Sequence, residues 1–73
     1  MVKPKRLYRG LPVTKTQARK YMADARRDVL SAAYCIKNGD LDSAIAYNSR
    51  AAEALTNANV LLYYLREKAE RGQ

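Results

Sequence analysis

Apolar side chains recur along most of this chain at alternating steps of three and four residues. The first stripe consists of small and medium-sized side chains: Ala18, Met22, Ala25, Val29, Ala32 and Ile36. The second stripe continues with the same spacing: Ala44, Asn48, Ala51, Leu55, Ala58, Leu62, Leu65 and Ala69. An average step of about 3.5 residues is typical of the seam between packed antiparallel helices. The pattern therefore predicts two helices, at about residues 15–38 and 41–70.

The residues around each predicted helix end support these limits. Thr14, followed three residues later by Gln17, matches a capping box and indicates where the first helix begins. Gly39 can take the left-handed conformation that closes a helix, and Asp40 offers a carboxylate to the free N–H groups of the next one. Because so few residues join the two helices, we expect an all-α fold, an antiparallel two-helix hairpin.

The first 13 residues differ in character from the rest. Both prolines, Pro4 and Pro12, lie here together with Gly10, so a helix is not expected. We divide the chain into a basic, irregular N-terminal arm (residues 1–13) and a helical hairpin (residues 14–73). A domain of 73 residues is marginally stable alone. A second copy that completes a four-helix bundle, or a larger partner, could supply the missing stability.

The second helix is apolar on every side over residues 60–65, and such a helix is normally buried on more than one side. The segment 7–13, a second hairpin or another protein could cover it. We predict an interface at the following residues: Val60, Leu61, Tyr63 and Tyr64. Two interpretations of Asn48 stay open. It is either a buried asparagine that fixes register or partner number, or a residue at the edge of a slightly rotated seam.

The stretch from Tyr21 to Leu62 resembles an archaeal family catalogued as domain of unknown function three-five-seven. The resemblance rests on the turn segment 37–42, on the following Ser-Ala-Ile-Ala, and on Ala51 and Leu55. Basic ribosomal proteins of helical-hairpin form, such as the bacterial S-twenty family, are also similar. The resemblance implies a helical hairpin of archaeal origin. It implies no catalytic residues, because the family has no assigned activity.

The residue types argue against an enzyme. Cys35 has no histidine to act as its base, so we expect it to pack as a small apolar residue. Three carboxylates, those of Asp24, Asp28 and Glu53, could approach a divalent ion. They lack the Glu-x-x-His element of carboxylate metal sites in helical bundles, and we expect a solvated charged face instead. We predict no catalytic residue, no metal site and no cofactor.

The charge of the chain is distributed unevenly. The net charge is +7, and residues 1–20 hold seven basic residues and no acid, so the remaining residues balance to zero. Such asymmetry suggests a polyanionic partner. Arginine suits phosphate, and a tyrosine within the arm can stack on a base. We therefore predict a nucleic-acid-binding site, with RNA favoured over DNA, at these residues: Lys3, Lys5, Arg6, Tyr8, Arg9, Lys15, Arg19 and Lys20.

These observations lead to two functional hypotheses. The first is a small non-enzymatic nucleic-acid-binding protein, such as a ribosomal or ribosome-associated component. The alternative is a protein-interaction or dimerisation module that uses the apolar end of the second helix. No secretion signal is visible, the longest apolar run is far shorter than the ~20 residues of a membrane span, and a lone cysteine fits a reducing compartment. We expect a cytoplasmic location.

Overall fold

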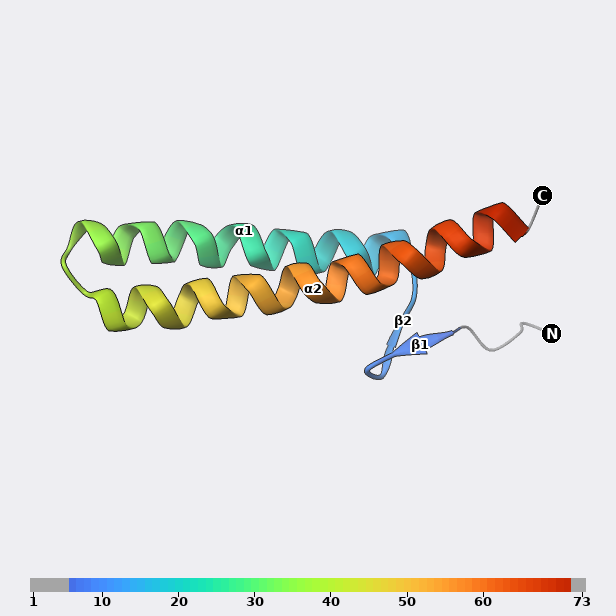
Figure 1. The fold of residues 1–73 in the computed structure, drawn as a ribbon, viewed down its shortest axis with the longest axis horizontal. Coiled ribbons are helices and arrows are strands. Elements are labelled where there is room, and N and C mark those ends of the chain that lie inside the picture. The colour runs from blue at the N-terminus through green and yellow to red at the C-terminus, as the bar shows by residue number, and fades with distance from the viewer. Residues whose placement is uncertain (1–5, 72–73) are drawn as a thin grey trace.

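Two long antiparallel helices form most of the structure, and a short β-hairpin precedes them (Figure 1). The computed structural model describes residues 6–71, with side chains as far as residue 68. The elements follow one another along the chain as β1 (Leu7–Tyr8), β2 (Leu11–Pro12), α1 (Lys15–Lys37) and α2 (Leu41–Arg71). The two helices pack against each other along α1, and α2 continues beyond it, which gives a rod of 53 × 22 × 14 Å. The predicted helical hairpin is confirmed.

Helix α1 begins at the predicted capping residue. Thr14 has an extended backbone, and its Oγ1 accepts a hydrogen bond from the backbone N–H of Gln17 at 3.0 Å. This bond satisfies one of the donors that the first turn of a helix leaves free.

The turn between the helices is a Schellman motif. Gly39 has a φ of 77°, so it is in the left-handed region. The backbone N–H of Asp40 donates to the carbonyl of Cys35 at 2.8 Å, and that of Gly39 donates to the carbonyl of Ile36 at 3.0 Å. Asp40 then caps the start of helix α2, because its Oδ1 accepts a hydrogen bond from the backbone N–H of Ser43 at 3.1 Å. Both local predictions at this turn are confirmed.

Alanines at every seventh position form the contact between the helices. The buried seam consists of Ala18, Ala25 and Ala32 on α1 and of Ala44, Ala51 and Ala58 on α2. Small side chains let helix axes approach closely. Leu61 is the one large apolar side chain among the described residues that is completely buried.

The predicted stripes also contained the larger residues between the seam alanines. The prediction that these residues pack between the two helices is wrong for the single chain. Met22 and Val29 lie about half exposed beside the seam, whereas Asp28, one position earlier, is buried. The helices are rotated so that residues three positions after each seam alanine, rather than four, complete the contact. Asn48 is exposed, which agrees with the interpretation that it lies at the edge of a rotated seam.

The described part of the arm is a β-hairpin rather than an irregular segment. Strands β1 and β2 pair antiparallel, with Leu7 opposite Pro12 and Tyr8 opposite Leu11. Arg9 and Gly10 form the two-residue turn, with φ values of 54° and 80°. Positive φ at both positions is the signature of a type I′ turn, whose twist matches that of the paired strands.

Among the residues that the structure describes, no helix combines the length and the apolar character needed to cross a bilayer.

Replacing Gly39 with valine tests the turn. A Cβ atom at this position would meet no atom within 4 Å, so the penalty comes from the left-handed backbone alone. We expect Gly39→Val to lower the free energy of unfolding by about 1–2 kcal/mol, measured by chemical denaturation. Gly39→Asn is the matched control and should lower it less, because asparagine tolerates this conformation. Equal losses in the two variants would contradict this account of the turn.

The stabilisation of α2 by its capping residue, Asp40, should depend on pH. Hydrogen bonds from Ser43, first its side chain and then its backbone N–H, lower the pKa of the Asp40 carboxyl below its usual 3.8. A lowered pKa in the folded state means that the ionised cap stabilises above pH 3.8 and that this contribution fades as the pH falls through the folded-state pKa. The difference in denaturation midpoint between wild type and Asp40→Ala should therefore narrow in acid. A difference that stays constant with pH would argue against a charged cap.

Candidate nucleic-acid interface

The tip of the β-hairpin is hydrogen-bonded to α2. The Tyr8 hydroxyl donates to Oδ1 of Asn57 at 3.0 Å, and Nη1 of Arg9 donates to the same oxygen at 3.3 Å. The Arg9 guanidinium also lies 3.8 Å from Oε2 of Glu53. Asn57 is buried, so a polar side chain inside the structure is satisfied by two donors from the arm. A buried amide without such partners would be strongly destabilising.

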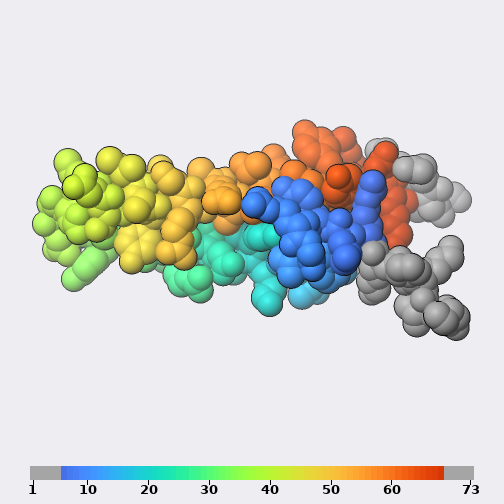
Figure 2. All heavy atoms as spheres, turned by 90° about the horizontal axis from the view of Figure 1, so that it is seen from below, coloured from blue at the N-terminus to red at the C-terminus, as the bar shows by residue number. Residues whose placement is uncertain are grey.

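The base of the β-hairpin makes a second contact with α2. The Arg6 guanidinium carbon lies 4.0 Å from the centroid of the Tyr64 ring, a cation–π distance. Its Nη1 is 4.0 Å from Oε1 of Glu67. The arm residues from Arg6 to Arg9 are therefore anchored along α2 at both ends of β1. Figure 2 shows this arm, in blue, lying over the molecule beside α2.

The anchoring residues of α2 lie on one side of the helix because of their spacing. Glu53, Asn57, Tyr64 and Glu67 follow one another at steps of four, seven and three residues. Residues three, four or seven apart share one helix face. The sequence did not predict that Glu53, Asn57 and Glu67 contact the arm. Their helical spacing is visible in the sequence. A search for apolar stripes does not detect it, because three of these four residues are polar or charged.

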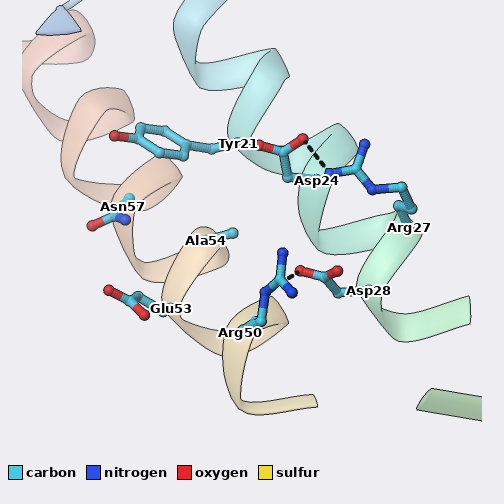
Figure 3. Close-up of a pocket in the computed structure, with 8 residues that line it drawn as sticks. All are labelled: Tyr21, Asp24, Arg27, Asp28, Arg50, Glu53, Ala54 and Asn57. Atoms are coloured by element: carbon cyan, nitrogen blue, oxygen red, sulfur yellow. Dashed lines mark hydrogen bonds and ion pairs between the residues drawn. The ribbon is translucent and has the colours of Figure 1, made fainter. Parts of the chain in front are cut away.

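A polar hollow of about 190 Å³ lies between the helices next to the arm (Figure 3). Asp28 of α1 is only 5% exposed, and its Oδ2 lies 3.7 Å from Nε of Arg50 on α2. Our prediction that Asp28 belongs to a solvated face is wrong, because the rotation of the helices brings it into the seam opposite Arg50. Asp24 is exposed and pairs with Arg27 at 3.2 Å, as its spacing predicts.

This hollow does not assemble a metal site. Within the described residues, no three potential ligands among histidine, cysteine and carboxylate side chains come close enough together to hold an ion. Cys35 is a free, half-buried thiol.

The predicted nucleic-acid-binding residues fall into three groups. Lys3 and Lys5 lie outside the described residues. Arg6, Tyr8 and Arg9 contact α2 as given above, and the two arginine side chains are each 57% exposed. The cations on the first turns of α1 are exposed and form no ion pair with another described residue: Lys15, Arg19 and Lys20.

The predicted interface at residues 60–65 is partly covered by the chain itself. Leu61 is completely buried, and Tyr64 is half-buried beneath Arg6. Val60 is also half-buried, whereas Tyr63 is 60% exposed and carries Arg66 at 5.2 Å from its ring centroid. Of the covers proposed for this apolar stretch, the arm accounts for the side that holds Asn57 and Tyr64. Among the four residues of the predicted interface, Tyr63 alone keeps a broadly exposed ring.

No known protein family, no curated protein and no solved structure matches this chain. The resemblance to the archaeal family and to the ribosomal proteins therefore stays a prediction, and functional inference rests on the residues themselves.

Removing one hydroxyl tests the docking of the arm. Tyr8→Phe deletes the hydrogen bond to the buried Asn57 and should lower the free energy of unfolding by about 0.5–1.5 kcal/mol. Trypsin should also cleave faster after Arg9 in this variant, because the arm leaves α2 more often.

Tyr63→Phe is the matched control for this experiment. The Tyr63 hydroxyl makes no hydrogen bond with another described residue, so its loss should change neither quantity. If Tyr8→Phe left the cleavage rate at the Tyr63→Phe level, the arm would not be held by this bond.

Proposed function

We propose that the protein is a small, non-enzymatic nucleic-acid-binding protein that favours structured RNA and contacts phosphates with the basic end of its rod. One observation carries the proposal. Lys15, Arg19 and Lys20 are exposed without an acidic partner among the described residues, and they directly follow an arm that displays Arg6 and Arg9.

The distribution of charge supports a polyanionic partner. The whole excess of +7 belongs to residues 1–20, and the rest of the sequence balances to zero. The described part of this stretch, residues 6–20, lies toward one end of a 53 Å rod and carries five basic residues without an acid. A concentrated positive field raises the rate of encounter with polyanions. Release of counterions from phosphates then supplies affinity without sequence recognition.

The contacts of Arg6 and Arg9 with α2 are compatible with phosphate binding. Their ion pairs with Glu67 and Glu53 measure 4.0 and 3.8 Å, and both partners of each pair are more than half exposed. Exposed pairs of this kind contribute at most about 1 kcal/mol. A phosphate, which accepts two parallel hydrogen bonds from one guanidinium, can therefore compete with the glutamates.

Because the arm is already docked on α2, nucleic-acid binding would cost less conformational entropy. A segment that orders only on its ligand loses conformational entropy at that moment. The described arm residues already fold on α2, so the β-hairpin presents its arginines from a rigid base. The Tyr8 hydroxyl donates to Asn57, and this contact supports a role for Tyr8 in positioning the arm.

The sequence contains no motif that reads base edges, so we do not propose sequence-specific binding. Contacts to phosphates at one end of a rod suit recognition of a folded RNA by its shape. A cytoplasmic ribonucleoprotein particle, such as the ribosome, is the kind of partner that we propose.

Salt dependence of binding provides the test. We would titrate the full chain against an RNA stem–loop and a DNA duplex of matched sequence at several salt concentrations. Each lost phosphate contact should flatten the log–log salt slope by about 0.7–0.9. The double variant Lys15→Gln/Lys20→Gln should therefore flatten it by up to roughly 1.4–1.8. Deletion of residues 1–13 removes four further cations and should flatten it more.

The matched control is Arg26→Gln/Lys37→Gln, which removes the same charge from the middle and the loop end of the rod. Both side chains are exposed and unpaired within the described part of the chain. Equal effects of the two double variants would show that net charge acts without a localised site. Failure of the full chain to bind either probe at low salt would refute the proposal.

A further inference from the structure

One broad face of the helical hairpin is apolar and uncovered. It is formed by seven large side chains that are each between 45% and 65% exposed, and we call it the apolar face: Met22, Val29 and Ile36 of α1 with Leu41, Ile45, Leu55 and Leu62 of α2.

Their spacing places these residues on the same side of the alanine seam. Met22, Val29 and Ile36 each lie four residues after a seam alanine of α1, and Leu55 and Leu62 lie four residues after seam alanines of α2. In an antiparallel pair these positions flank the seam on one side, and the positions three residues after the alanines flank it on the other. A hollow of about 450 Å³, lined by Ile36, Leu41, Ile45 and Asn48 with two seam alanines, shows that the two helices share this face near the loop.

The opposite side of the seam carries the polar contacts. It holds the pair of Asp28 with Arg50 and the docking site of the arm at Asn57. The apolar face is therefore separate from the docked arm. Of the cations on which the proposed function rests, Arg19 lies three residues before Met22 and so on the apolar-face side of α1.

The apolar face is large for a single chain. The distance from Leu41 to Leu62 along α2 is roughly 30 Å at the usual helical rise, and two adjacent helices are roughly 20 Å across. The face therefore covers roughly 600 Å² per copy, near the upper limit of the apolar patches that monomers expose. Pairing two such faces would bury roughly 1,200 Å², the lower end of specific protein interfaces.

The thin core of the single chain indicates that this face needs a cover. Apart from Leu61, the described buried core consists of alanines, which bury little apolar area each. Most of the exposed large aliphatic side chains among the described residues lie on the apolar face instead. Covering them would supply the hydrophobic burial that a domain of this size lacks.

We propose that the apolar face binds a second copy of this chain, which forms an antiparallel four-helix bundle with the two loops at opposite ends. The two-fold axis lies in the interface, perpendicular to the helices, so that α1 packs on α1 and α2 packs on α2.

The charge distribution selects a second copy in this orientation. A parallel pair would bring two strongly basic ends together, and like charges repel. An antiparallel pair places the basic end of each copy beside the other copy's loop. That loop carries Asp40 and Asp42 against the single cation Lys37, so its net charge is −1 and not strongly positive. It also holds the carboxyl end of α1, whose helix dipole favours cations. Arg19, on the apolar-face side of α1, is placed to use this contact.

The middle of the face fits the two-fold axis. Val29 and Asn48 lie near the centre of its length, so rotation about the axis brings each close to its own counterpart. Asn48 is the one polar side chain that lines the hollow of the apolar face. Two asparagines facing each other can exchange hydrogen bonds, a known device for fixing register and copy number. The same rotation places Met22 of one copy opposite Ile36 of the other.

The first experiment measures the mass of the full chain by sedimentation equilibrium across a range of concentrations. We expect a reversible dimer. Val29→Lys should weaken it by roughly a hundredfold or more, because each dimer loses two buried valines and gains two charges. Leu30→Lys is the matched control, since Leu30 is 62% exposed and is not on the apolar face. Circular dichroism of both variants reports whether the helices remain folded.

The second experiment tests the orientation. In a Cys35→Ser background, Val29→Cys should be joined efficiently between copies by a short thiol crosslinker. A parallel pair would pack α1 on α2 and hold the two thiols apart. Mixed chains carrying Met22→Cys and Ile36→Cys should also crosslink, whereas Leu30→Cys should not.

A wild-type chain that stays monomeric at high concentration would overturn the proposal, as would a dimer equally weakened by Leu30→Lys. A dimer that crosslinks at Leu30→Cys but not at Val29→Cys would refute this face as its interface. Association only with a different protein, from a wild-type chain that does not self-associate, would also refute it.

Discussion

Close packing of alanines is the constraint on which the rest of the structure depends. Alanine at every seventh position on both helices lets the backbones approach, and it fixes a seam with little side-chain volume. The free energy gained from such a seam is small, since each alanine buries little apolar area. Larger side chains are consequently displaced to the two flanks of the seam, and the flanks decide what the molecule can bind.

The two flanks have opposite chemistry. On one flank, Asp28 pairs with Arg50, and Asn57 receives Tyr8 and Arg9 of the arm. On the other flank, aliphatic side chains face solvent without any acid among them. The arm thus satisfies the polar flank from within the chain, whereas the aliphatic flank has no cover within the described residues. This division is what allows a basic end and an exposed aliphatic face to coexist on so short a chain.

The helix limits could be read from the sequence because local chemistry determines them. Gly39, Asp40 and Thr14 act through their own backbone and side-chain atoms within a few residues. The rotation of the helices could not be read in the same way. Next to a seam of alanines, either the residues three positions after each alanine or those four positions after it can complete the contact between the helices. The periodicity of apolar residues favoured the second set, which is the more apolar. The structure instead buries Asp28, whose partner Arg50 lies on the other helix.

The basic residues of the candidate site could be predicted from the sequence, but the contacts that they make with α2 could not. A run of basic residues without acids is visible in the sequence, so Arg6 and Arg9 were found. Their docking was not visible, because it depends on Asn57, nearly fifty residues away, and on a β-hairpin that lacks the usual Asn-Gly signal. Polar contacts between residues far apart in the chain produce no periodic pattern in the sequence.

At the turn of the β-hairpin, the backbone conformation favours one kind of residue and the side-chain contacts require another. Arg9 has a φ of 54°, a region where asparagine or glycine would be less strained. The chain nevertheless places an arginine there, and that arginine reaches Glu53 and Asn57 from the tip of the turn. A substitution that relaxes the turn would remove this cation, and one that keeps the cation must retain the strain. Selection for a more stable fold and selection for a charged tip would therefore act on this position in opposite directions.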